Sequence, residues 1–174
     1  MAFPPTDELE CAVFDTDWGW VGAARSGRGL VSLAWPRPSA EEALVAIREA
    51  TRAKRQVPNF SGFGKKLRDY FAGKRIVFDE ALDFMTATPF QRQVWLATRE
   101  IPYRETRSYA WVAGRLGKSM AYRAVGQALG KNPLPIIVPC HRVLTSAGTI
   151  GGFSEGLGIK RRLLQMEGAF CPKV

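Results

Sequence analysis

The sequence is poor in the two residue types that most often bind metals or form cross-links. Among 174 residues there is one histidine, His141, and there are three cysteines, Cys11, Cys140 and Cys171. Three cysteines cannot all pair with one another, and no Cys-x-x-Cys motif is present. The sequence therefore predicts neither a disulfide framework nor a zinc site, and we expect no metal.

The sequence also lacks a long hydrophobic run. No apolar stretch approaches the roughly 20 residues that a membrane-spanning helix needs, and residues 1–8 lack the basic head and apolar middle of a signal peptide. We therefore expect a protein without a membrane partner that acts in the cytoplasm, or in the nucleus of a eukaryote. The length and the 46% hydrophobic content suffice for one ordinary domain or two small lobes.

Acidic residues are scarce in the second half of the chain. The net charge is +9, and beyond residue 88 the carboxylates are Glu100, Glu105, Glu155 and Glu167. A basic excess of this size favours a polyanionic partner, nucleic acid before a membrane surface. The alternative is that the charge serves solubility alone.

The one histidine directly follows a cysteine, after the apolar, proline-bracketed stretch Leu134–Pro139. A neighbouring base or cation lowers the pKa of a cysteine from about 8.5 to roughly 3.5–7.5, which produces the nucleophilic thiolate. Cys140 and His141 therefore predict an activated nucleophile. The alternative is a packed core thiol, because free cysteine is among the most buried residue types.

Residues 1–84 predict a small α+β lobe, in which apolar stretches alternate with turn residues. A capping box that begins at Ser39 opens the first helix. The expected elements are strands at Cys11–Phe14, Trp18–Ala23 and Leu30–Trp35, helices from Ser39 to about Arg52 and at Phe63–Phe71, and a strand at Ile76–Phe78.

Residues 85–174 predict a mostly helical lobe, after a boundary at Asp83–Thr88. Thr88-Pro89-Phe90-Gln91 is a strong helix start, with a capping threonine, proline at the first helical position and glutamine at the third. The expected helices run from Thr88 to before Pro102, from Tyr109 to Leu116, from a Ser119 cap to Leu129, and from Leu157 to Glu167. The middle two, around a tight turn at Gly117, predict a helix-turn-helix.

Two residues of these helices have a functional and a structural interpretation. A glycine inside a helix costs about 1 kcal/mol relative to alanine, so Gly126 serves either close packing on another lobe or a close approach to DNA. Glu167 lies in a last turn, where the helix dipole disfavours an acid by roughly 0.3–1 kcal/mol. It is either a solvated surface residue or the partner of His141.

The cysteine segment belongs to a set of motifs that resembles one family. Pro139-Cys140-His141-Arg142-Val143, preceded by Asn132-Pro133, is similar to the signature of the O6-alkylguanine–DNA alkyltransferases. The other similar segments follow the family's order and spacing: Thr88–Trp95, Ile101–Tyr103, Thr106–Tyr109, Arg123–Gly126, Gly151–Ser154 and Glu167-Gly168. The resemblance covers residues 88–170 and extends weakly through the first lobe.

This resemblance implies an α+β fold. A ribonuclease-H-like N-terminal lobe, residues 1–84, would precede a mostly helical, winged-helix-like domain, residues 85–174, that binds DNA and accepts the alkyl group. The partner would be double-stranded DNA with O6-alkylguanine, approached through the minor groove. The protein would be a monomer, and whether molecules cluster cooperatively on DNA is left open.

The resemblance also implies the chemistry. An alkyl group on guanine O6, and also on thymine O4, would pass irreversibly to Cys140 after base flipping, once per molecule and without a cofactor. His141 would be the base, acting through a bound water, and Glu167 would hold its imidazole. Asn132 would tie the second helix of the helix-turn-helix to the cysteine segment.

The remaining implied roles concern binding. Tyr109 and Ser154, together with Val138 and Gly151, would bind the flipped guanine. Arg123 would be the finger residue, whose side chain fills the space that the flipped base leaves in the DNA base stack. Further DNA contacts would come from Ser108, Ala124, Gly126 and Arg142.

The sequence departs from the family pattern at Arg104, Tyr122, Phe153 and Glu155. Tyr122 stands directly before the expected finger residue, Arg123, where a small residue is usual. No departure removes a required group.

The sequence argues against three other functions. An alkyltransferase-like protein binds lesions without transfer and has tryptophan in place of the cysteine, so Cys140 argues against it. A cysteine hydrolase or transferase acting on small substrates leaves the basic helix-turn-helix unused, and adjacent Cys-His suits papain-like geometry poorly. A helix-turn-helix regulator predicts strong sequence preference and needs no Cys140.

Overall fold

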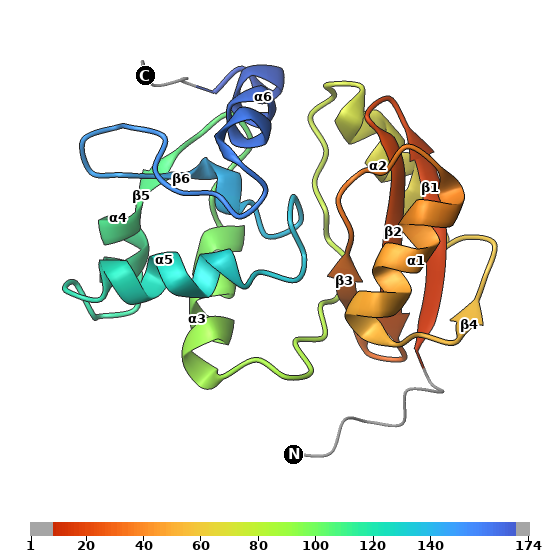
Figure 1. The fold of residues 1–174 in the computed structure, drawn as a ribbon. Helices are drawn as coiled ribbons and strands as arrows, with labels where there is room; N and C mark the ends of the chain where they lie inside the picture. The colour runs from red at the N-terminus through yellow and green to blue at the C-terminus, as the bar shows by residue number, and fades with distance from the viewer. Residues whose placement is uncertain (1–8, 170–174) are drawn as a thin grey trace. The chain divides into compact units, whose positions relative to one another are not determined.

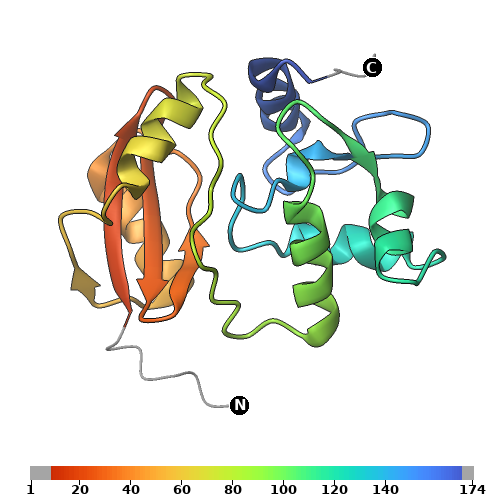
Figure 2. The ribbon, with the colours of Figure 1, turned by 180° about the vertical axis from the view of Figure 1, so that it is seen from behind.

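The computed structural model describes residues 9–169, which divide into two compact units. The first comprises residues 9–86 with residues 133–135, and the second comprises residues 87–132 and 136–169. A sheet with two helices forms the first unit, and five of the seven elements of the second are helical (Figures 1 and 2). The predicted α+β fold class is confirmed.

The first unit is built on a four-stranded sheet with the order β3-β2-β1-β4. β1 (Glu10–Thr16), β2 (Gly19–Ser26) and β3 (Gly29–Leu33) pair antiparallel in succession, as the three alternating apolar stretches predicted. The fourth strand, β4 (Arg55–Gln56), pairs parallel with β1. Its two polar, exposed residues gave no hydrophobic signal, and the sequence did not predict it.

The strand expected at Ile76–Phe78 is wrong, because these residues form no strand. Val77 is 73% exposed. Phe78 packs instead by its ring, with centroids 5.7 Å from Tyr70 and 6.2 Å from Phe63. Side-chain packing rather than backbone pairing holds this segment.

The two helices of the unit, α1 (Ala40–Thr51) and α2 (Phe63–Phe71), cover opposite faces of the sheet, as the two views show (Figures 1 and 2). Successive residues of a strand point to opposite faces, so Cys11 packs in a cluster with Ile47 of α1, whereas Phe14 meets Phe63 of α2 edge to face. Cys11 is therefore a core thiol of this unit. Cys171 lies outside the described residues.

The contact between α1 and β2 depends on Gly22. A Cβ atom at this position would lie 2.5 Å from the carbonyl oxygen of Ala43 and 3.0 Å from Cβ of Ile47. Any side chain here must push the helix away from the sheet.

We expect the Gly22→Ala variant to lose about 1–3 kcal/mol of unfolding free energy, the usual cost of overpacking. Urea denaturation followed by circular dichroism measures the loss. Gly27→Ala is the matched control, because a Cβ at residue 27 would meet nothing within 4 Å. Equal stability of the two variants would contradict the close approach.

The second unit begins with α3 (Pro89–Arg99), and its cap is the predicted one. The Thr88 hydroxyl accepts a hydrogen bond from the Gln91 backbone N–H at 3.2 Å, and the Gln91 side-chain oxygen accepts from the Thr88 backbone N–H at 2.9 Å. The indole N–H of Trp95 on α3 donates to the carbonyl of Ala128 at 2.9 Å. This bond fastens the second helix of the helix-turn-helix to α3.

The predicted helix-turn-helix consists of α4 (Tyr109–Arg115) and α5 (Tyr122–Gly130). Ser108 caps α4 by accepting from the Trp111 backbone N–H at 3.0 Å. The predicted Ser119 cap of the second helix is wrong. Residues 119–121 form a turn, in which the Ala121 N–H donates to the carbonyl of Lys118, and α5 begins at Tyr122 without a side-chain cap.

Two short strands that the sequence did not predict position the cysteine segment. β5 (Arg107–Ser108) pairs parallel with β6 (Val143–Leu144). This pairing joins the start of α4 to the strand that follows a single 3₁₀ turn, Cys140–Arg142. The glycine-rich loop then leads into α6 (Leu157–Glu167). No helix within residues 9–169 is long and apolar enough to cross a membrane.

Candidate active site

Cys140 opens the 3₁₀ turn and faces a pocket of the second unit. Its side chain is buried, with 8% of the residue exposed, and it lines a pocket of about 380 Å³. Tyr109, Gly126, Gly151 and Ser154 line the same pocket. Cys140 fits both interpretations from the sequence, a core thiol and a reactive one, since it is buried and also accessible to a ligand in the pocket.

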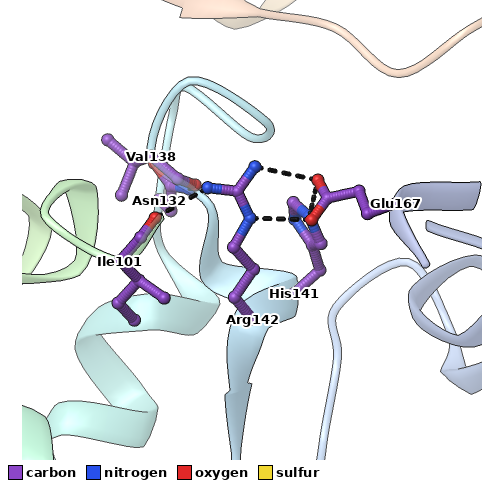
Figure 3. Close-up of polar contacts among 6 residues, drawn as sticks. All are labelled: Ile101, Asn132, Val138, His141, Arg142 and Glu167. Carbon is purple, nitrogen blue, oxygen red and sulfur yellow. Dashed lines mark hydrogen bonds and ion pairs between the residues drawn. The ribbon is translucent and has the colours of Figure 1, made fainter. Parts of the chain in front are cut away.

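Asn132 connects the end of α5 to the cysteine. Its amide N–H₂ donates to the carbonyl of Val138 at 2.9 Å (Figure 3). The same amide donates to Sγ of Cys140 at 3.3 Å. The side chain of Val138 is fully buried, and the residue does not line the pocket, so it contributes its carbonyl to positioning Cys140. The contact of Val138 with guanine stays a prediction.

Glu167 is buried in the centre of a polar network. Its carboxylate lies 2.8 Å from Nε2 of His141 and accepts two hydrogen bonds from Arg142, both of 2.9 Å (Figure 3). Arg142 also donates to the carbonyl of Ile101 at 2.7 Å. Of the two interpretations of Glu167, the structure matches the partner of His141 and not the solvated surface residue.

This network determines which nitrogen of His141 is able to accept a proton. Burial alone would raise the pKa of Glu167, but the hydrogen bonds from His141 and Arg142 hold it well below its usual range. Burial lowers the pKa of His141, against the opposing effect of Glu167. A neutral imidazole beside an ionised carboxylate donates from Nε2, so Nδ1 carries the lone pair that accepts a proton.

The cysteine differs from the sequence-based expectation in its ionisation. Burial raises the pKa of the Cys140 thiol, and the hydrogen bond from Asn132 and the charge of Lys160 only partly oppose this effect. A neutral histidine supplies no cation to lower it. The resting group is therefore a thiol.

Lys160 is a site residue that the sequence analysis missed. It is fully buried, and its ammonium donates to the carbonyls of Val143 at 2.6 Å and Gly152 at 3.3 Å. Burial lowers its pKa to about 8, although the charge of Cys140 opposes this shift. A signal was present, because Lys160, Leu163, Leu164 and Glu167 have the i, i+3, i+4, i+7 spacing of one helix face.

Two of the glycines that line the pocket differ in whether a side chain could replace them. A Cβ on Gly151, whose φ is +64°, would lie 3.2 Å from the Tyr109 hydroxyl, so the loop needs glycine there. A Cβ on Gly126 would meet Tyr109 at 3.7 Å, an ordinary contact. Packing within the unit therefore does not explain Gly126.

The Tyr109 hydroxyl donates to the Gly152 carbonyl at 3.4 Å. The pKa of Tyr109 is raised mainly by burial and also by the charge of Cys140.

The residues predicted to contact DNA lie in two different places. Arg123 and Ala124 are exposed on the first turn of α5, and Ser108 is half-buried at its capping position. Arg142, in contrast, is 7% exposed and its guanidinium is committed to Glu167 and Ile101. The structure thus places Arg142 in the histidine network and not on the surface. The reason is that Glu167 offers a buried charged partner.

The described residues contain no group of three or more His, Cys, Asp or Glu side chains that could hold a metal ion.

Outside the pocket, Arg104 adopts a left-handed conformation with φ of 69°, and its guanidinium lies against Gly168 at the end of α6. This departure from the family pattern therefore packs on the second unit's own last helix.

The fold and the site define a class of protein: a two-unit chain in which a helix-turn-helix borders a pocket lined by a buried cysteine. Residues 89–169 match the family model of the 6-O-methylguanine DNA methyltransferase DNA-binding domain, and residues 10–84 match that of its ribonuclease-like domain. The chain belongs to the methylated-DNA–protein-cysteine methyltransferase family.

Individual proteins of this family are similar to this chain in sequence and in structure. A methylated-DNA–protein-cysteine methyltransferase of Mycobacterium bovis is 48% identical over 113 residues, which are 65% of this chain and 68% of the relative. The Mycobacterium tuberculosis O6-methylguanine methyltransferase structure is 37% identical, covers 95% of this chain and 96% of its own, and has a TM-score of 0.74. M. tuberculosis OGT in complex with DNA is 38% identical over 91% and 92% of the two chains, with a TM-score of 0.73.

The buried charge of Lys160 predicts a pH dependence of stability. Below pH 8 the native state holds a buried ammonium, whereas the unfolded chain stays protonated up to about the ordinary value of 10.5. The unfolded state binds more protons between these values, so the unfolding free energy rises with pH there. In a Cys140→Ala background, which removes the thiol's own titration, we expect a rise on the order of 2 kcal/mol.

Urea denaturation from about pH 7.5 to about pH 10 measures this rise. Lys160→Met should abolish it, whereas Arg162→Met, which removes an exposed cation of the same helix, should leave it intact. The same slope in Lys160→Met and its parent would contradict the assignment.

Proposed function

We propose that this protein repairs DNA by moving the alkyl group of O6-alkylguanine, and of O4-alkylthymine, onto Sγ of Cys140. The observation that carries the proposal is the buried thiol of Cys140, which faces a pocket beside a helix-turn-helix and directly precedes the His141–Glu167 pair. DNA repair by alkyl transfer is the function of the family. The residue roles below are our proposal for this chain.

The reaction needs a base, because Cys140 rests as a thiol. Nδ1 of His141 takes the proton through a bridging water, and Glu167 stabilises the imidazolium that results. The sulfur then attacks the alkyl carbon. A C–S bond forms, the bond from that carbon to O6 breaks, and its electron pair stays on the guanine. The guanine then takes up one proton, which balances the proton that Cys140 gave to His141. The products are a thioether and unmodified guanine.

Hydrogen-bond donors at the pocket wall promote departure of the guanine. Negative charge develops on the base as the bond to O6 breaks, and donors placed for that charge lower the barrier. Tyr109 and Ser154 line the pocket and carry hydroxyls. The thioether cannot be hydrolysed under mild conditions, so each molecule acts once, and the reaction needs no cofactor.

Access to the alkyl group requires base flipping, since a base inside a duplex is out of reach of Cys140. Arg123, exposed on the first turn of α5, fills the vacated stack with its planar guanidinium. The small residues Ala124 and Gly126 let α5 approach the minor groove, which is about 6 Å wide, and Ser108 adds a contact. We further propose that the protein binds DNA as a monomer and works inside the cell.

The non-transferring alternative is not favoured. Alkyltransferase-like proteins carry tryptophan at the position of the cysteine, and here Cys140 faces the pocket. Among the residues that the structure describes, those lining the Cys140 pocket all belong to the second unit.

Incubation with DNA that contains O6-methylguanine should raise the mass of the intact protein by one CH₂ unit, located on Cys140. The transfer is irreversible, so the yield should saturate at one group per molecule. Intact-protein and peptide mass spectrometry measure both. Cys140→Ala should bind the DNA and gain nothing, and Cys11→Ala should react like the wild type. Methylation of Cys140→Ala would contradict the mechanism.

Arg123→Ala should slow transfer from duplex DNA at least about tenfold but leave the reaction with free O6-benzylguanine nearly unchanged. The reason is that only a stacked base must be flipped, at a cost of a few kcal/mol. Single-turnover rates on both substrates measure the difference. Lys131→Ala, which removes a charge at the other end of α5, controls for charge alone. Equal losses on both substrates in Arg123→Ala would remove the finger role.

A further inference from the structure

The face of α5 that borders the Cys140 pocket consists of small or aliphatic residues with one exception. Tyr122, Gly126, Leu129 and Gly130 line the pocket, and their spacing of four, three and one residues is that of a single helix face. Tyr122 is the one aromatic residue of α5. The family resemblance implies a small residue at this position, so the aromatic ring departs from the pattern that the resemblance predicts.

Tyr122 lies at the mouth of the pocket and not at its base. It lines the pocket and is nevertheless 41% exposed, whereas Cys140, on the same pocket, is 8% exposed. A side chain exposed to this extent adds little to the core of the unit. Its ring is placed to meet a ligand that passes between solvent and the thiol.

The ring of Tyr122 also lies beside Arg123, the proposed finger residue. The guanidinium carbon of Arg123 lies 5.9 Å from the centroid of the Tyr122 ring, within the range of a cation–π contact. The residue that fills the duplex and the residue at the pocket mouth are therefore neighbours in sequence and in space.

We infer that Tyr122 is a substrate-contacting residue that stacks on the everted base at the pocket mouth. The inference rests on the proposed function of the Cys140 pocket. Every base offers an aromatic face, and stacking on an aromatic side chain contributes about 1–3 kcal/mol per base. The O6 substituent must point to Cys140, so the exposed ring of Tyr122 contacts the purine and not the alkyl group.

Kinetics with free O6-benzylguanine test this contact without the duplex. We expect Tyr122→Ala to raise the half-saturating concentration about tenfold with an unchanged rate constant at saturation, because Cys140, His141 and Glu167 are intact. Tyr122→Phe keeps the ring and should remain close to the wild type. Met120→Ala, an 86% exposed residue of the preceding turn that does not line the pocket, should have no effect.

Binding measured without transfer separates this inference from the proposed function. Titration calorimetry of O6-benzylguanine with Cys140→Ala and with Cys140→Ala/Tyr122→Ala should give about tenfold weaker binding for the second. Equal affinities would overturn the Tyr122 contact and leave alkyl transfer standing. A wild-type protein that acquires no alkyl group on Cys140 overturns the proposed function, and the inference with it.

Discussion

The candidate active site depends on the hydrogen bonds of the buried Glu167 carboxylate with His141 and Arg142. Taking a carboxylate and a guanidinium out of water costs several kcal/mol per ion, and good geometry with further hydrogen bonds must offset that cost. Here Arg142 donates twice to Glu167 and once to the Ile101 carbonyl, and His141 completes the set. The network thereby joins the end of α6, the 3₁₀ turn and the segment after α3, and it orients the imidazole.

Burial gives the site its chemical character. It keeps the Cys140 sulfur protonated at rest and His141 neutral, so the nucleophile is formed during the reaction and not stored as a thiolate. A buried thiol is protected from adventitious oxidation and alkylation, since reactivity follows thiolate character and exposure. In the proposed mechanism each molecule reacts once, so this protection preserves Cys140 until the protein meets its substrate. The positive charge of Lys160 favours the thiolate form of Cys140, because it opposes the effect of burial on the pKa of the thiol.

The pocket itself depends on backbone conformation as much as on side chains. Gly151 allows the loop to pass beside Tyr109, and the Lys160 ammonium holds the Gly152 carbonyl and the Val143 carbonyl together. The strand pair β5–β6 ties the start of α4 to the residues after Cys140. The pocket wall, the nucleophile and the helix-turn-helix are thus parts of one packed unit.

Local chemistry was readable from the sequence, and long-range chemistry was not. The Thr88 capping box, the helix-turn-helix spacing and the adjacent Cys140 and His141 depend on residues a few positions apart, so sequence alone determined them. Strand β4, the core packing of Phe78 and the start of α5 depended on neighbours that no local pattern identifies. Only the tertiary structure decided that Arg142 is buried, that Lys160 belongs to the site and that Cys140 rests as a thiol. Ionisation and hydrogen bonding of a side chain are determined by its desolvation and by partners brought together from distant parts of the chain.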